Sequence, residues 1–442
     1  MRNPLGSRDA SLQRGRRGSR RLGSGAAVIG ALTVALVAAA CRDITTLEQT
    51  NPGQLGPDVF APENANLIVN SSRADFECAF NEYIVASGTF MDELANAISQ
   101  TSNFDLDRRT ITPNSPVGTS TCTAQQFAGV YTPLSVARAS NDVAVAHLEG
   151  WTDAQVPDRD HLIAEASAYA GYSLLLLGEG MCSAALDLGP EILPPQLFAD
   201  AVVRFDTAVA AATRAGDSQT LHLALLGRAR AQLDLGKPAA AATDARQIPP
   251  GFEVDIDHDA TATRRQNLVY IQILQSAFAS VDTSIQNRYA AAPQDPRIAV
   301  ASTGKLGSDG HTVIWYPKKD AQATSPQALA RYAEAQLIIA ENDVSTGDLA
   351  GAVAIINDLR TAAGLSAFNP VTLTAPVVMA EIVEQRRREF FLEGHRLGDI
   401  RRLGLPLSPA TGAPYVSGGT YADQSCFPLP NVERINNPNL GS

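Results

Sequence analysis

Hydrophobic residues recur at spacings of three and four along most of the chain, which predicts a mainly helical protein. Residues 63–100 show this pattern and predict one or two helices. A segment rich in Thr, Asn and Pro, 101–121, predicts a loop, and the helical pattern resumes over 125–148. Two further segments, 161–178 and 196–215, mix small alanines with large apolar side chains. This composition is typical of helices that are covered on more than one side.

Shorter helices are predicted to follow as antiparallel pairs. Residues 220–235 and 238–246 are joined by a turn at Gly236, and residues 326–342 and 349–363 by a polar turn. Stacked helical hairpins bury their apolar faces by setting large side chains of one helix against small ones of its neighbour. The pattern therefore predicts tetratricopeptide-like units. Because the match to a strict repeat is loose, a plain irregular helical domain is the alternative.

Two parts of the chain lack helical periodicity. Residues 297–325 predict a loop-rich insertion with a short pair of strands, and residues 403–442, rich in Gly, Pro and Asn, predict a coil lying over the helices. The predicted fold class is therefore mainly α. It combines tetratricopeptide-like helical hairpins, at 161–246 and 326–363, with a loop-rich insertion and an irregular C-terminal coil.

The N-terminus predicts an exported protein. Residues 1–21 hold seven arginines and one acid, residues 22–40 are uncharged, and three alanines precede Cys41. This order is typical of a signal peptide (1–40) whose cleavage leaves a cysteine for lipidation. An uncharged stretch of about 20 residues also suits a transmembrane helix, and an ordinary secretory signal is the second alternative. On the preferred interpretation, acyl chains on Cys41 hold the protein at a membrane.

The expected domain organisation follows from that anchor. We expect a lipidated stalk at 41–62, rich in Pro and Gly, and a single helical body at 63–442. The net charge of −11 disfavours a nucleic-acid surface.

Four cysteines remain beyond the lipidation site, and an even number in an exported chain permits two disulfides with three connectivities. We favour one of these pairings, in which the second bond ties the tail to the helices. The favoured bonds are Cys78–Cys122 and Cys182–Cys426.

Motifs for catalysis, cofactors and metals are not found in the sequence. It has no phosphate-binding, dinucleotide-binding, zinc-protease or serine-hydrolase signature, and the six histidines are scattered. Asp255, Asp257 and Asp259 alternate as calcium ligands do, but Ala260 and Gln266 stand where that loop needs glycine and glutamate. We therefore expect a solvated loop, no cofactor and no enzymatic activity.

The most distinctive segment is 381–402, EIVEQRRREFFLEGHRLGDIRR. Its periodicity predicts an amphipathic helix with Ile382, Phe390 and Phe391 directed inward, supported by Glu384 four residues before Arg388. A glycine at 394 then ends the helix. The simplest interpretation of its charges is structural, because arginines and glutamates near a chain reversal commonly bond to each other and to buried carbonyls.

This segment resembles the signature of the RagB/SusD family of nutrient-uptake lipoproteins. Three other stretches are similar to the family as well, and the lipidation motif with Asn51-Pro52 fits its start. They are the helical pair with Arg331-Tyr332-Ala333-Glu334-Ala335, Ala340-Glu341, Ile356 to Arg360 and Ala363-Gly364-Leu365; the turn Asp295-Pro296-Arg297; and the ending with Phe427-Pro428-Leu429-Pro430, Glu433 and Asn436-Asn437-Pro438-Asn439. Together these stretches cover most of the second half of the chain.

The resemblance implies a lipid-anchored protein of the cell outer membrane, exposed at the surface, that does not catalyse a reaction. Its expected partner is a TonB-dependent (SusC-like) barrel transporter, to which it delivers a glycan or another oligomeric nutrient. Sugar capture generally uses aromatic faces and a few polar groups. Trp315 and Tyr316, in the loop-rich insertion, are our candidate ligand-binding residues, and packing in the core is the alternative role.

Two other classes of function remain to be compared. A lipid-anchored tetratricopeptide-like scaffold for periplasmic or outer-membrane assembly would share the helical pairs but would not explain the 381–402 segment. A polysaccharide hydrolase would need two carboxylates across a cleft, about 5 to 10 Å apart. Glu384 and Glu389 are five residues apart and point to different faces of one helix.

Overall fold

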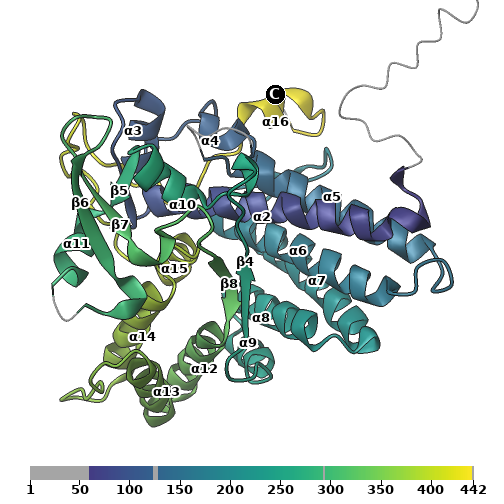
Figure 1. Cartoon of the computed structure of the whole chain (residues 1–442). Coiled ribbons are helices and arrows are strands. Elements are labelled where there is room, and N and C mark those ends of the chain that lie inside the picture. The colour runs from purple at the N-terminus through teal and green to yellow at the C-terminus, as the bar shows by residue number, and fades with distance from the viewer. Residues whose placement is uncertain (1–58, 123–127, 292–293, 441–442) are drawn as a thin grey trace, which may run out of the picture. The chain divides into compact units, whose positions relative to one another are not determined.

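The computed structural model describes residues 59–122, 128–291 and 294–440. Its first half is built from helices that each pack against the next, with α2 lying along α5 and α6 (Figure 1). These helices are α2 (Ala65–Phe90), α5 (Tyr131–Gly150), α6 (Arg159–Gly180), α7 (Pro194–Ala215), α8 (Ser218–Asp234) and α9 (Pro238–Ala245). The mainly α, tetratricopeptide-like fold predicted from the sequence is confirmed.

Small residues accept large ones between these helices. The ring of Phe205 on α7 lies against Gly171 of α6 and Gly227 of α8, where an added Cβ atom would approach the ring to 2.7 Å and 2.4 Å. Any larger residue at either glycine would therefore push the helices apart. The turn between α7 and α8 uses Gly216 at a φ of 68°, and Asp217 caps α8 by accepting a bond from its backbone.

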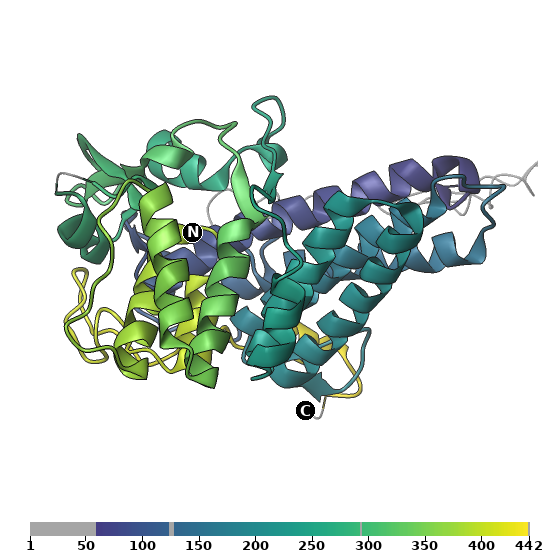
Figure 2. The same ribbon diagram turned by 90° about the horizontal axis from the view of Figure 1, so that it is seen from below.

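A second group of helices follows the irregular middle of the chain. It consists of α12 (Tyr332–Thr346), α13 (Leu349–Ala362), α14 (Ala375–Glu389) and α15 (Arg396–Leu403). Helix α12 packs against α13 and α14 on one side and against α9 on the other. Figure 2 shows this group, in green, beside the teal helices that precede it. Leu337, Ile356, Ile382 and Phe390 belong to a hydrophobic cluster within the group.

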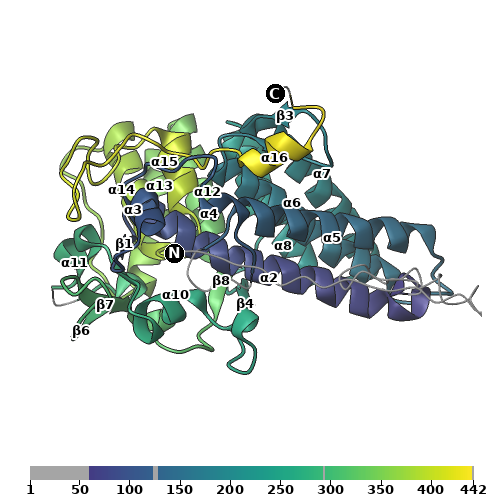
Figure 3. The ribbon, with the colours of Figure 1, turned by 90° about the horizontal axis from the view of Figure 1, so that it is seen from above.

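Short strands form antiparallel pairs, and several of the pairs join distant parts of the chain. They are β1 (Leu94–Asn96) with β5 (Ala279–Val281), β2 (Ala184–Ala185) with β3 (Glu191–Ile192), β4 (Glu253–Ile256) with β8 (Gln327–Arg331), and β6 (Val300–Leu306) with β7 (Val313–Pro317). In Figure 3, β6, β7, α10 (Leu268–Tyr270) and α11 (Thr283–Tyr289) gather around the end of α2 that leads into β1.

The remaining elements are short helices of three to seven residues. They are η2 (Pro62–Asn64), α3 (Thr101–Asp107), α4 (Pro116–Thr119), η3 (Thr263–Arg265), η4 (Ile271–Gln275), η5 (Pro296–Ile298), η6 (Lys318–Asp320) and α16 (Asn431–Asn436). The β6–β7 hairpin is the strand pair predicted in the insertion. The predicted C-terminal coil is irregular apart from α16 and two isolated bridges, Pro414 with Thr420 and Phe427 with Met181.

Three local predictions are wrong in detail. The helix predicted over 63–100 ends at Phe90, the loop predicted over 101–121 contains α3 and α4, and the helix predicted from residue 326 begins only at Tyr332. The first and third errors have the same cause. β1 and β8 form because partner strands from distant segments supply their hydrogen bonds, and local periodicity does not report such partners.

The described residues from Val59 onward form one unit. Phe60, within the segment predicted as stalk, stacks on the ring of His147, with ring centroids 4.3 Å apart. The predicted signal peptide and most of the predicted stalk, including Cys41, lie outside the described residues. Among the helices that the structure describes, none is both long enough and apolar enough for a membrane span.

Candidate functional site

The 381–402 segment forms a helix, a tight turn and a second helix. α14 ends at Glu389, α15 begins at Arg396, and the turn between them places Gly394 at a φ of 74°. A side chain at Gly394 would also meet Phe80 and Tyr83 of α2 at about 3.3 Å. Phe390 and Phe391 are buried as predicted. The turn is therefore fixed against α2 by backbone conformation and by close packing.

The charges of the segment face inward and bond to one another. Arg386 donates through Nε to both carboxylate oxygens of Asp399, at 2.9 and 2.8 Å. Arg402 donates to both oxygens of Glu341 on α12, at 2.6 and 3.0 Å, and also to Asp399. Burial raises the pKa of Asp399, but the two arginines outweigh it and hold that pKa below its usual range. This cluster thus joins α12, α14 and α15.

A second cluster connects the turn to the irregular middle of the chain. Glu389 accepts bonds from Arg297 at 2.6 Å and from Arg331 at 2.9 Å. Glu393 accepts from Arg331 at 3.0 Å and from Lys319 at 2.7 Å. Both carboxylates are nearly buried. The Asp295-Pro296-Arg297 turn and the start of α12 are therefore tied to the signature segment through charge-assisted bonds.

Two ion pairs of Asp92, and a hydrogen bond from Arg230, tie the segment to the first half of the chain. Asp92, just after α2, accepts bonds from Arg387 at 2.9 Å and from Arg396 at 2.8 and 2.9 Å. On α8, Arg230 forms a bidentate pair with Glu179 of α6, with both bonds at 2.6 Å, and donates to the carbonyl of Gly394. The side chains of Arg230 and Glu179 are 4% and 3% exposed, so this pair lies in the interior.

His395 lies beside Arg230 without carrying a charge. Burial lowers its pKa well below the usual value, and the nearby Arg230 and Arg386 lower it further. A neutral imidazole accepts through Nε2, which lies 3.2 Å from Nη1 of Arg230. Burial also raises the pKa of the neighbouring Glu334 to about 7. The carboxylates of Glu389, Glu393 and Asp399 are engaged by basic side chains, which fits the structural interpretation of the segment.

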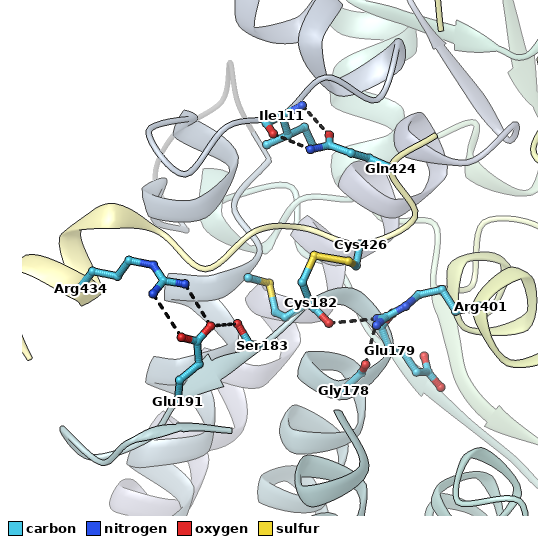
Figure 4. Close-up of a disulfide and its surroundings, with 11 residues drawn as sticks. Ile111, Gly178, Glu179, Cys182, Ser183, Glu191, Arg401, Gln424, Cys426 and Arg434 are labelled. Carbon is cyan, nitrogen blue, oxygen red and sulfur yellow. Dashed lines mark hydrogen bonds and ion pairs between the residues drawn. A yellow bond between two sulfur atoms is a disulfide. The ribbon is translucent and has the colours of Figure 1, made fainter. Parts of the chain in front are cut away.

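The end of the chain, here called the terminal strap (residues 405–440), crosses the helices and is fixed by side chains from distant elements. Gln424 exchanges two hydrogen bonds with the backbone of Ile111, and Arg434 forms an ion pair with Glu191 (Figure 4). The Cys182–Cys426 disulfide joins the strap to the end of α6 in the same view. Phe427 then stacks on Phe90 of α2.

The structure also joins Cys78 to Cys122. With Cys182–Cys426, this is the pairing that we favoured from the sequence. Cys78 lies on α2, and Cys122 follows α4, so the bond fixes the segment after β1 to the long helix. The first disulfide thus fixes a segment near the start of the described chain, and the second fixes the terminal strap near its end.

The structure places the predicted aromatic pair on opposite faces of one strand. Trp315 and Tyr316 are neighbours in β7, so their side chains alternate, and both are half-buried. Trp315 shares its face with Val313, and Leu306 on β6 is the direct partner of Val313. Leu306 is 52% exposed and Val313 is 43% exposed. Trp315 therefore lies on the same face as two exposed apolar side chains, but both Trp315 and Tyr316 also pack against the main hydrophobic core, the alternative role considered for them.

Sequence reasoning missed a second aromatic group, which lies between α3 and the terminal strap. Tyr415 contacts Phe104 and Tyr421, with ring centroids 5.9 and 5.3 Å apart. Arg109 stacks over Tyr421 and donates to three carbonyls of the strap. The contacts join residues about three hundred positions apart, so no local signal predicts them.

The alternating aspartates do not converge. Asp255 lies on β4, paired with β8, while Asp259 accepts bonds from Thr261 in a turn. Among the described residues, no three His, Cys, Asp or Glu side chains are grouped so that they could hold a metal ion.

Comparison with known proteins identifies both the signature segment and the fold. Residues 305–438 match the model of the SusD family. No curated protein matches the sequence. A SusD superfamily protein from Bacteroides fragilis, 17% identical, superimposes with a TM-score of 0.67 over 86% of this chain and 99% of its own.

Two further solved structures agree with this result. A SusD-like carbohydrate binding protein from Bacteroides vulgatus, 16% identical, has a TM-score of 0.64 over 86% of this chain and 97% of its own. Surface glycan-binding protein A from Bacteroides uniformis, 14% identical, also has a TM-score of 0.64, over 84% of this chain and 98% of its own. Residues 305–438, which contain the charged signature, thus match the SusD family model, and the chain shares the fold of SusD superfamily structures along most of its length.

Proposed function

We propose that this protein is a surface lipoprotein of the outer membrane that captures a glycan and delivers it to a TonB-dependent, SusC-like barrel transporter. The observation that carries the proposal is the SusD family match over residues 305–438, on a fold shared with surface glycan-binding proteins. The buried ion pairs of the signature segment support a structural role for that segment, because they engage its charges in the interior.

Trp315 is the proposed contact for the sugar. An indole face stacks on the apolar face of a pyranose ring, and the exposed neighbours Leu306 and Val313 would extend the contact surface. Leu306 and Val313 are exposed, so a long oligomer can approach this part of the hairpin without entering a closed pocket. Its polar neighbours Ser302 and Lys305 are exposed and supply groups for sugar hydroxyls.

The second tryptophan of the chain provides a matched control. Trp151 lies at the end of α5, beside Phe60 and His147, in a separate hydrophobic cluster. We expect Trp315→Ala to weaken oligosaccharide binding about tenfold, which corresponds to roughly 1.4 kcal/mol. Trp151→Ala should leave it unchanged. Equal effects of the two variants in calorimetric titration would exclude Trp315 as the contact.

Partner capture tests delivery. The full chain, tagged and expressed in its own outer membrane, is solubilised in mild detergent, purified and analysed by mass spectrometry. A stoichiometric TonB-dependent barrel supports the proposal. Co-purification of assembly factors without a barrel would favour the tetratricopeptide-like scaffold instead.

Metabolic labelling tests the anchor. We expect labelled palmitate on the wild-type chain and none on Cys41→Ser, whereas Cys426→Ser, which removes a disulfide-bonded cysteine instead, should keep the label. Label on the Cys41 variant would contradict lipidation at that residue.

A further inference from the structure

A bulge in β6 interrupts the β6–β7 hairpin beside the proposed sugar contact. Ser302 lies opposite Trp315, and the next pair along the ladder is Leu306 with Val313. Residues 303–305 of β6 therefore lie between two pairs that only one residue of β7 separates. Extra residues of this kind bend a strand and redirect a side chain, and they are treated as built features of a sheet.

Side-chain hydrogen bonds fix this bulge. The hydroxyl of Ser302 accepts a bond from the backbone N–H of Gly304 at 3.1 Å, and Gly304 has a φ of 71°, which favours glycine. The hydroxyl of Thr303 accepts from the backbone N–H of Lys305 and donates to the carbonyl of Ile314, both at 3.1 Å. The backbone of Lys305 is therefore held in place directly before the exposed Leu306.

The ammonium group of Lys305 is free. The residue is exposed, and among residues 59–122, 128–291 and 294–440 no group bonds to its Nζ atom. Lys318, just after β7, is also exposed and donates only to the neutral amide oxygen of Gln294, at 2.9 Å. Lys319 differs, because it pairs with Glu393 at 2.7 Å. Two positive charges of the hairpin region thus have no acidic partner within the described chain.

The acid of this region is engaged in the turn. Asp309 is the one acidic residue of the sequence from 300 to 319, and its side chain is 3% exposed. It accepts the backbone N–H groups of His311 and Thr312, both at 3.0 Å, and the hydroxyl of Thr312 at 2.5 Å. Three of the four lysines of the chain lie at 305–319, although the net charge of the chain is −11. The hairpin is therefore locally basic on an acidic protein.

We infer that the glycan bound at the hairpin is anionic and that Lys305 binds its carboxylate or sulfate ester groups. This inference rests on the proposed capture of a glycan and names its chemical class. Hydroxyls also accept bonds from an ammonium, but an anionic group neutralises the charge as well, and such charge-assisted bonds are about twice as strong. Leu306 and Val313, beside the bulge, are exposed and would contact ring carbons.

The position of Lys318 favours a polymer with repeated charges. Lys318 follows Val313 by five residues, which is roughly 17 Å along an extended strand. Val313 pairs with Leu306, the neighbour of Lys305, so the two free ammonium groups belong to opposite ends of the hairpin. A single charged sugar would engage one of them, whereas an oligomer can engage both.

Calorimetric titration of the full-length protein tests the inference with two matched pairs of probes. One pair is oligogalacturonate and its methyl ester, and the other is a sulfated galactan oligosaccharide and its desulfated form. We expect the charged member of at least one pair to bind at least tenfold more tightly than the neutral member, and that pair distinguishes carboxylate from sulfate ester. The preference should shrink between about 0.05 and 0.5 M salt, because salt screens exposed charges.

Three lysine variants assign the preference to its residue. Lys305→Gln should reduce the ratio of charged to neutral binding at least fivefold, and Lys305→Arg, which keeps the charge, should retain it. Lys237→Gln is the matched control, because Lys237 is also exposed, lies in the turn before α9, and has a side chain that bonds to nothing in the described chain. That variant should bind as wild type does.

Equal binding of the charged and neutral members of both pairs, no binding of any probe, or a preference that survives Lys305→Gln would each overturn the inference. The proposed function is scored separately. A neutral oligosaccharide that binds wild type and Lys305→Gln equally, but not Trp315→Ala, would support capture at the hairpin and refute the charge preference. Co-purification of a barrel does not depend on the charge of the glycan.

Discussion

Replacing Arg230 by methionine tests how much the fold depends on its buried charges. Methionine retains an unbranched apolar chain of similar reach and removes the guanidinium. In the native protein this group makes two bonds of 2.6 Å to Glu179 and one of 3.0 Å to the carbonyl of Gly394. The variant leaves the carboxylate of Glu179 in the interior with its principal counter-charge gone. The loss in the free energy of unfolding should therefore exceed the contribution of the three lost hydrogen bonds.

The expected loss follows from the burial of the pair. Breaking a buried ion pair by removing one partner costs about 3 to 5 kcal/mol. An unfolding entropy of about 2.1 cal/mol/K per residue gives roughly 0.8 kcal/mol/K for a unit of about 380 residues. The melting temperature should then fall by about 4 to 6 °C.

Calorimetry of the purified chain measures this shift, and Arg214→Met is the matched control. Arg214 pairs with Asp160 at 2.8 Å, but its side chain is 56% exposed, so that pair should contribute less than about 1 kcal/mol. Adding Glu179→Gln to Arg230→Met should recover part of the loss, because it removes the uncompensated charge. If the Arg230 and Arg214 variants melt alike, the assignment of the signature network to fold stability is wrong.

Three further predictions concern the disulfide, the helix packing and pH. Cys426→Ser removes a disulfide whose cysteines are 244 residues apart, and denaturant titration should show a loss of roughly 2 to 5 kcal/mol in the free energy of unfolding. This difference from wild type should disappear when both proteins are measured under reducing conditions. Gly227→Val should lower the free energy of unfolding by about 1 to 3 kcal/mol, and adding Phe205→Leu should recover part of that loss. Additive losses in the double variant would contradict the contact between Gly227 and Phe205. Burial raises the pKa of Glu82 from 4.5 to about 8, so the unfolded chain releases this proton first and stability should fall from pH 4.5 to 8. Glu82→Gln should flatten the fall, and an unchanged pH profile would refute the assignment.

The sequence predicted those parts of the fold whose signal is local. The hairpin α7–α8, with Gly216 at its turn, and the inward side chains Ile382 and Phe390 follow from periodicity and helix caps, which depend on neighbours three or four residues away. Local periodicity predicts helix at β1 and β8, because their three to five residues show no distinct alternation. What makes them strands is the partner segment.

The candidate sites show the same division between features with a local sequence signal and features that depend on distant partners. The signature segment could be located from its own residues, and its charges were expected to pair. Their partners Asp92, Glu179 and Arg230 lie outside the segment, and no spacing rule connects them with it. Likewise, neighbouring positions in the sequence suggested that Trp315 and Tyr316 act together, but strand geometry separates neighbours onto opposite faces.

The arrangement of charges separates the bonds that hold the fold from the exposed face of the hairpin proposed to bind a sugar. Solved structures only 12 to 17% identical keep this fold. Here the interior is held by ion pairs that join α2, α6, α8, α12, α14 and α15, and by a strap fixed through Cys426 and Arg109. None of these bonds involves the exposed face of the β6–β7 hairpin. Substitutions at Leu306 or Val313 should therefore change the ligand preference of the proposed hairpin site at little cost in stability, and a screen of oligosaccharides against variants of that face measures this.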